Sequence, residues 1–199
     1  MLARQIALEE GNETVAVIAL GERSLAGALS NYIEYLKTGR EGLLETALDT
    51  TRKVTALAQA ARIADLWWWS NALFYLLREF GNSSLWRGLN GFTPPGPATA
   101  IVGRYIAAGL SREPAITSLW PSQQAAIPWL TRADRPSFCV RMPTSAGKTR
   151  IAEMAILKAL IEPREGAEAK CVYVAPFRSL AVEVERTLRR GLGPLGYRV

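Results

Sequence analysis

Apolar residues recur at helical spacing through about the first 90 positions of the chain. They follow one another one, three or four positions apart, which is the period of a helix that buries one face, as in Leu25, Leu29, Tyr32, Ile33 and Leu36. Gly21, Gly39 and Gly81 interrupt this pattern where helices are expected to end. The first part of the chain is therefore predicted to be an α-helical bundle or an array of helical hairpins.

After residue 116 the pattern changes to short apolar runs that alternate with helical segments. Residues 137–141 and 170–175 favour β structure, and the second run is apolar enough for a buried strand of a parallel sheet. Helical spacing follows each run, first in Ile151, Ala152, Ala155, Ile156, Ala159 and Leu160, and then in Leu180, Val184 and Leu188. This βαβα order predicts a right-handed parallel α/β sheet.

The predicted fold class is α + α/β, in two domains. Residues 1–115 are expected to form an α-helical domain, and residues 116–199 the α/β domain, which Gly196 to Val199 would continue into a third strand. Glycine and proline residues between positions 88 and 98 break any helix and make this stretch the best candidate for a linker.

The turn at residues 142–149, with the sequence MPTSAGKT, has the residues of a phosphate-binding loop between a predicted strand and a predicted helix. Gly147 lets the backbone approach an anion, the Lys148 ammonium suits the β- and γ-phosphates, and the Thr149 hydroxyl suits Mg²⁺. The backbone of Thr144, Ser145 and Ala146 completes the expected cradle, and the helix dipole adds to it. Met142 stands where the general pattern has glycine, and a turn without a ligand is the alternative interpretation.

Gln123 follows Pro121 and Ser122, at the expected start of a short helix. A glutamine amide both donates and accepts, so it can pair with N6 and N7 of adenine and distinguish ATP from GTP. A solvated side chain is the alternative at such a position.

Charge and composition narrow the functional classes. Residues 1–115 carry 11 basic and 11 acidic side chains, whereas residues 116–199 carry 13 and 7, so the net charge of +6 lies in the second part. This asymmetry favours a polyanionic partner, although a basic surface also serves solubility. The chain has no histidine, which excludes a Ser/His/Asp triad within it, and its two cysteines, expected in buried strands, indicate a reducing cytoplasmic setting.

Two further features concern partners and membranes. Trp67, Trp68 and Trp69 cannot share one face of a helix, so at least one is expected to be buried. Packing in a core or interface is favoured over stacking on nucleic-acid bases. The apolar run at residues 66–77 is too short to span a bilayer, and no membrane association is predicted.

Three segments resemble, in order, motifs of superfamily 2 DEAD/DEAH-box helicases, most closely those of the Ski-type branch. Residues 119–123 (LWPSQ) are similar to the Q motif, residues 142–149 to motif I, and residues 174–181 (VAPFRSLA) to motif Ia. The resemblance covers about residues 116–199. It implies a RecA-like domain and an ATP-driven motor on single-stranded DNA or RNA.

The resemblance also implies roles for individual residues. Gln123 would read adenine, Lys148 and Thr149 would be the catalytic phosphate and Mg²⁺ ligands, and a motif Ia turn would hold the backbone of the strand. In this chain that turn is Pro176, Phe177, Arg178 and Ser179, with Phe177 in place of the usual leucine.

The carboxylate pair of the family and the motifs of a second RecA-like domain do not follow in this sequence. We therefore expect the N-terminal part of a larger helicase, with a truncated first RecA-like domain, that binds ATP weakly and hydrolyses none by itself. The helical residues 1–115 would then be an accessory domain that docks on the motor or on a protein partner. The alternatives are another class of P-loop NTPase, such as a kinase or GTPase, and a helical scaffold with an incidental P-loop.

Overall fold

The chain divides into two compact units, Met1–Asn82 and Ser83–Val199, each with its own apolar core. The computed structural model describes residues 2–92, 97–132, 137–143, 146–162 and 170–199. Residues from Ser83 onward, including α4 (Leu85–Leu89) and α5 (Pro97–Leu110), pack into the second core.

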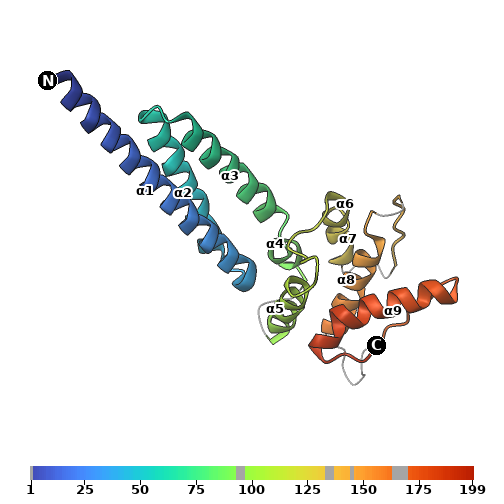
Figure 1. Cartoon of the computed structure of the whole chain (residues 1–199). Helices are drawn as coiled ribbons and strands as arrows, with labels where there is room; N and C mark the ends of the chain where they lie inside the picture. The colour runs from blue at the N-terminus through green and yellow to red at the C-terminus, as the bar shows by residue number, and fades with distance from the viewer. Residues whose placement is uncertain (1, 93–96, 133–136, 144–145, 163–169) are drawn as a thin grey trace. The chain divides into compact units, whose positions relative to one another are not determined.

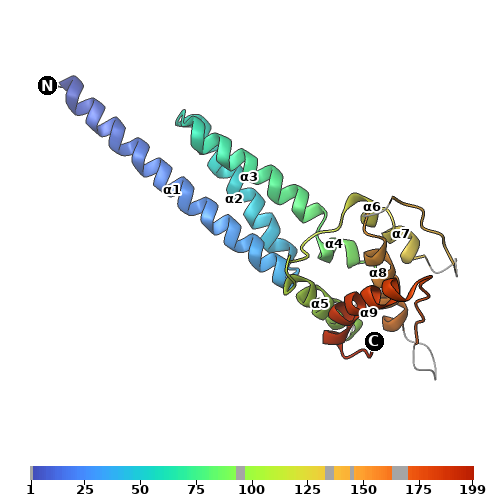
Figure 2. The same cartoon turned by 45° about the vertical axis from the view of Figure 1, so that its right-hand side comes forward.

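The first unit is a layer of three helices, α1 (Leu2–Thr38), α2 (Glu41–Ala60) and α3 (Ala64–Asn82), which run side by side (Figures 1 and 2). α2 packs against both of its neighbours, through small buried side chains such as Ala47 and Ala58. α1 and α3 contact each other much less. The helical prediction for this part of the chain is confirmed.

The glycines of this unit have different roles from one another. Gly39 has a φ of 69° in the turn after α1, where the left-handed backbone favours glycine, as predicted for a helix end. Gly21 instead lies inside α1, so its predicted role as a helix end is wrong. A Cβ at Gly21 would come within 2.6 Å of Leu66 in α3, and glycine therefore permits the close approach of the two helices.

The second unit packs its helices around α8 (Lys148–Ile161). α4 (Leu85–Leu89), α5 (Pro97–Leu110) and α9 (Arg178–Leu192) contribute to one apolar cluster with it. The short helices α6 (Pro121–Gln124) and α7 (Ile127–Leu130) also contact α8, and a 3₁₀ turn, η1 (Gly193–Leu195), follows α9. The core side chains of α8 are Ile151, Met154, Leu157 and Ile161.

The two predicted strands are not strands in the described part of the chain. Residues 137–141 and 170–175 are loops, and Val172 and Val174 are 87% and 85% exposed. Cys139 and Cys171, which were expected in buried strands, are also exposed. A strand forms only when a neighbour pairs with its N–H and C=O groups, and no described residue does so here. The described residues are helices and loops, with one isolated bridge between Ser84 and Ser118.

The three consecutive tryptophans lie on α3 and are all partly exposed. The exposed fractions are 39% for Trp67, 57% for Trp68 and 64% for Trp69, so the expectation that at least one is buried is wrong. Trp68 and Trp69 pack edge to face, with their ring centroids 4.8 Å apart. Among the described helices, none has the length and apolar character that crossing a bilayer requires.

Candidate nucleotide-binding site

The candidate site lies where the loop before α8 meets the first turn of that helix. Gly147 caps α8 with φ of 84° and ψ of 29°, and its carbonyl accepts hydrogen bonds from the amides of Arg150 and Ile151. The first amides of a helix have no partner within it, and they form its positive end. The first turn of α8 therefore directs its backbone N–H groups and its positive potential toward the loop that precedes the helix.

Lys148 is exposed and folds back over this loop. Its Nζ donates to the carbonyl oxygens of Met142 and Pro143, at 2.8 Å from each. The side chain takes part in no ion pair with a described residue. A phosphate that displaced the two carbonyls would therefore meet an ammonium group without a competing carboxylate.

The α6 segment packs directly on the loop, although 24 residues separate the two in the sequence. Ser122 Oγ donates to the carbonyl of Ala146 at 3.1 Å. Gln123 is buried, its Oε1 accepts from the Trp120 amide at 2.9 Å, and its Nε2 lies where a Cβ on Gly147 would be. Gly147 is thus required both by its left-handed backbone and by the Gln123 side chain.

The remaining predicted ligands divide into two groups. Thr149 is half-buried in the first turn of α8, and Ala146 precedes that turn, so both lie beside Lys148. Thr144 and Ser145 lie outside the described residues. The structure thus brings together Gln123, Ala146, Gly147, Lys148 and Thr149.

The predicted strand-binding residues lie at the start of a different helix. Pro176 and Phe177 precede α9, and Arg178 and Ser179 form its first turn, with all four side chains exposed. Phe177 is 71% exposed, and the Ala181 amide donates to its carbonyl. The turn is therefore open to solvent at the positive end of a helix of 15 residues.

A buried polar cluster, which sequence reasoning missed, fixes the first turn of α8. Glu153 is fully buried, and its two carboxylate oxygens accept from Arg112 at 3.0 Å and from Arg150 at 2.8 Å. Arg150 also donates to the Tyr105 hydroxyl at 2.9 Å. A Cβ on Gly191 of α9 would overlap the Glu153 carboxylate. The cluster therefore links α8 to Tyr105 of α5 and to Arg112, and it packs against the backbone of α9.

One sequence signal pointed to this cluster. Glu153 lies four and eight positions before Leu157 and Ile161, on a face of the helix that is otherwise apolar. Burial raises the pKa of Tyr105 above its ordinary value of 10.0; the Glu153 carboxylate adds to the rise and Arg150 opposes it. Tyr105 is therefore a neutral hydrogen-bonding group at physiological pH.

Comparison with known proteins finds similarity to the DEAD/DEAH box helicases. Residues 120–199 match the family model of the DEAD/DEAH box helicases. The Hachiman protein HamB of Bacillus cereus is 34% identical over 179 residues, which cover 89% of this chain and therefore most of its first unit. The probable ATP-dependent RNA helicase ddx51 of Dictyostelium discoideum is 27% identical over 78 residues, or 39% of this chain.

The chain spans only a small part of each relative: the matched regions cover 15% of HamB and 14% of ddx51. The similarities support a relation to superfamily 2 helicases and a helicase-type nucleotide-binding function.

Proposed function

We propose that this chain is the N-terminal part of an ATP-dependent helicase or translocase of the Ski-type branch of superfamily 2. Residues 116–199 would be the beginning of its first RecA-like domain, and the helices before them an accessory domain. Hydrolysis would require a carboxylate pair and a second RecA-like domain supplied by the rest of the larger protein. The isolated chain would then bind ATP without hydrolysing it, and a cytoplasmic location fits its free cysteines.

The observation that carries this proposal is the contact between the α6 segment and the P-loop. An incidental Gly-Lys-Thr turn would not need a second segment against it, yet Ser122 and Gln123 both contact the loop. A Cβ on Gly147 would overlap the Gln123 amide, so the α6 segment requires glycine at this position of the loop.

The residues of the site fit ATP and Mg²⁺ in chemistry. Lys148 would hold the β- and γ-phosphates, the Thr149 hydroxyl would hold Mg²⁺, and the backbone of residues 144–147 would cradle the phosphates. Mg²⁺ supplies charge neutralisation for phosphoryl transfer when it is bound. Gln123 would read adenine with its amide, which is held in place by the Trp120 amide.

The exposed turn before α9 would hold single-stranded DNA or RNA. Pro176 and Phe177 would shape the turn, while Arg178 and Ser179 would contact the sugar-phosphate backbone together with the free amides of the helix. Such contacts position a strand without reading its sequence.

The exposed apolar loops would become strands in the larger protein. The side chains of Val172 and Val174 are almost fully exposed to water. Exposure of apolar side chains is unfavourable in free energy, and a partner that covered them would remove this cost. Pairing of residues 137–141 and 170–175 with further strands would bury them and complete a RecA-like parallel sheet.

The test is nucleotide selectivity in the longer protein. ATP hydrolysis is measured against GTP hydrolysis, with and without a single-stranded oligonucleotide, for the wild type and for Lys148→Ala. The proposal predicts preference for ATP, stimulation by the oligonucleotide, and loss of hydrolysis in the variant. A preference for GTP would favour a different P-loop NTPase, and a parent protein that works normally with Lys148→Ala would favour the scaffold alternative.

A second function, docking of a protein partner, is favoured by a groove in the first unit. A cavity of about 750 Å³ lies between α1 and α3 and is lined mainly by apolar side chains, including Leu29, Leu73, Trp68 and Trp69. Its charged lining residues are Glu22 and Asp65, both acidic. We infer that its occupant is an amphipathic helix whose apolar stripe is flanked by lysine or arginine.

Two designed peptides test the docking proposal. One is an amphipathic helix with lysines beside its leucine stripe, and the other has glutamates at the same positions. The lysine peptide is expected to bind at least tenfold more tightly and to shift the fluorescence of the exposed tryptophans to shorter wavelength. Equal binding of both peptides, or self-association of the chain that covers the tryptophans, would contradict it.

A further inference from the structure

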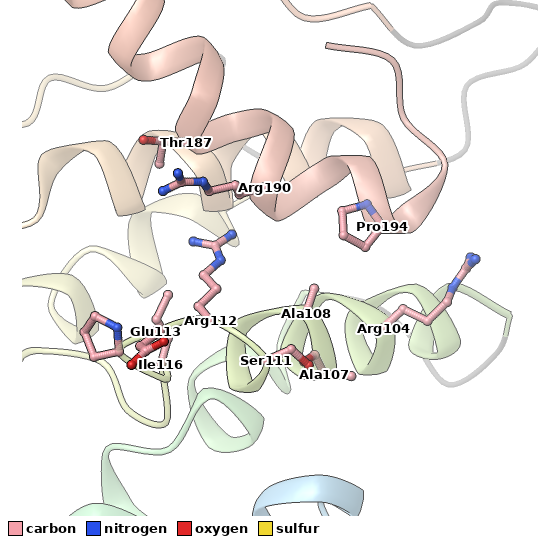
Figure 3. Close-up of a pocket in the computed structure, with 11 residues that line it drawn as sticks. Arg104, Ala107, Ala108, Ser111, Arg112, Glu113, Ile116, Thr187, Arg190 and Pro194 are labelled. Carbon is pink, nitrogen blue, oxygen red and sulfur yellow. The ribbon is translucent and has the colours of Figure 1, made fainter.

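We propose that a basic hollow between α5 and α9 is a second contact site for the phosphate backbone of a nucleic-acid strand. This site would be additional to the turn at Pro176–Ser179. The proposal rests on the proposed nucleic-acid-binding function. The hollow has a volume of about 910 Å³, and three arginines line it: Arg104, Arg112 and Arg190. Figure 3 shows Arg190 and Thr187 on α9 across from Arg104 on α5, with Ser111 directly after α5 and Arg112 reaching between the two helices.

Two of these arginines have no counter-ion among the residues that the structure describes. Arg104 and Arg190 are exposed and form no ion pair with any described residue, whereas Arg112 is already paired with Glu153. The Arg112 Nε is buried and has no hydrogen-bond partner in the described part of the chain. A site with unpaired guanidinium groups around a hollow is suited to anions, because arginine binds phosphate oxygens in a forked geometry.

The hollow continues along α9 toward the turn that is proposed to hold a strand. A neighbouring hollow of about 470 Å³ is lined by Ser179, Arg186, Thr187 and Arg190, and it shares the last two residues with the first. Arg186 has no ion pair in the described part of the chain either, and it lies one helical turn before Arg190. The path from Ser179 to Arg190 is about 16 Å long at 1.5 Å per helical residue.

This length favours a polymer over a small anion. One phosphate would occupy a fraction of the path, whereas a strand would place successive phosphates along it. The lining of the larger hollow also includes the apolar residues Ala107, Ala108 and Pro194, which would accommodate sugars or bases. The second unit as a whole has 16 basic and 8 acidic residues, a net charge of +8.

Two carboxylates lower the positive charge of the two hollows, so their removal should strengthen the binding of a nucleic acid. Glu113 lines the larger hollow and Glu183 lines the smaller one, and neither forms an ion pair with a described residue. Both would repel a phosphate backbone. Removal of the Glu113 charge should therefore strengthen binding.

The experiment measures the affinity of the full 199-residue chain for a fluorescent single-stranded oligonucleotide of 20 nucleotides, by anisotropy at several salt concentrations. The test variant is Arg104→Ala/Arg190→Ala, and the matched control is Arg23→Ala/Lys37→Ala, which removes the same charge from the exposed surface of the first unit. The test variant is expected to bind at least tenfold more weakly, with a salt slope smaller by about 1.4 for two lost phosphate contacts. Glu113→Gln is expected to bind twofold to threefold more tightly.

The outcomes separate this proposal from the proposed function. If Arg104→Ala/Arg190→Ala binds like the control while Arg178→Ala weakens binding, the second site is wrong and the proposed strand contact before α9 stands. If the wild-type chain does not bind the oligonucleotide at low salt, both nucleic-acid proposals fail, and ATP binding is judged separately. If poly-glutamate competes as well as a nucleic acid of equal charge, the hollow is a site for acidic protein and this proposal is overturned.

Discussion

Substitution of Glu153 by glutamine tests the buried cluster that supports the first turn of α8. The change keeps the size of the side chain and removes its charge. Arg112 and Arg150 each have a side chain that is 15% exposed, and both donate to this fully buried carboxylate. In the variant, two largely buried guanidinium groups lose their counter-ion, and the new amide nitrogen faces one of them donor to donor.

The expected loss of stability follows from this geometry. Removal of one partner from a buried ion pair costs about 3–5 kcal/mol, because the remaining charge stays desolvated without compensation. The matched control is Glu185→Gln, which removes the same charge from the exposed pair with Arg189 on α9. Exposed pairs of this spacing contribute about 0.3–0.5 kcal/mol. The two variants should therefore differ by several kcal/mol.

The assay must report on the second unit alone, since two compact units can unfold separately. Hydrogen exchange with mass spectrometry, in increasing urea, follows peptides from α5, α8 and α9. Glu153→Gln should lower the free energy of opening in all three helices, and Glu185→Gln should leave it nearly unchanged. Equal stability of the two variants would refute the reasoning, because it would mean that the carboxylate does not hold the three helices together.

Two further substitutions test the site and its surroundings. Gly147→Ala places an L-residue at a φ of 84°, which costs about 1–2 kcal/mol, and its Cβ would displace the Gln123 amide. Thermal unfolding should therefore show a less stable protein, and calorimetry should show weaker binding of ATP. A variant with unchanged stability and affinity would disprove the tight contact. Tyr105→Phe tests the raised pKa of the Tyr105 phenol. Above pH 10.0 the unfolded chain loses this proton while the folded chain keeps it. The contribution of Tyr105 to the stability of the fold is therefore complete below that pH and falls as the pH rises. The unfolding free energy of the wild type should thus decline more steeply above pH 10 than that of the variant. Parallel pH profiles would show that Tyr105 does not keep its proton.

The loop before α8 could be proposed as a phosphate site from the sequence because the chemistry that suggests it is local. Gly147 and Lys148 are adjacent, and the chemistry of glycine, ammonium and a helix start requires no knowledge of distant residues. The role of Gln123 could be proposed from its amide, but its burial against Gly147 depends on how α6 folds back on the loop. The structure locates this contact and leaves the recognition of adenine as a proposal.

The features that could not be predicted depend on distant partners. Burial of Glu153 requires Arg112, which lies 41 residues earlier in the chain. Residues 170–175 have the composition of a strand, but composition does not supply the neighbour whose backbone would pair with them. Gly21 was predicted at a helix end because glycine often lies there. In the structure it lies inside α1, where the missing side chain lets Leu66 of α3 approach closely.

The central claim is that the loop before α8 binds the phosphates of ATP through Lys148. Isothermal titration of the full chain with ATP and Mg²⁺ tests it most directly, with Lys148→Ala as the test variant and the surface substitution Lys53→Ala on α2 as the control. The account predicts measurable binding by the wild type and the control, and affinity at least tenfold lower for Lys148→Ala. Equal affinity of all three proteins, or no binding by the wild type, would contradict it.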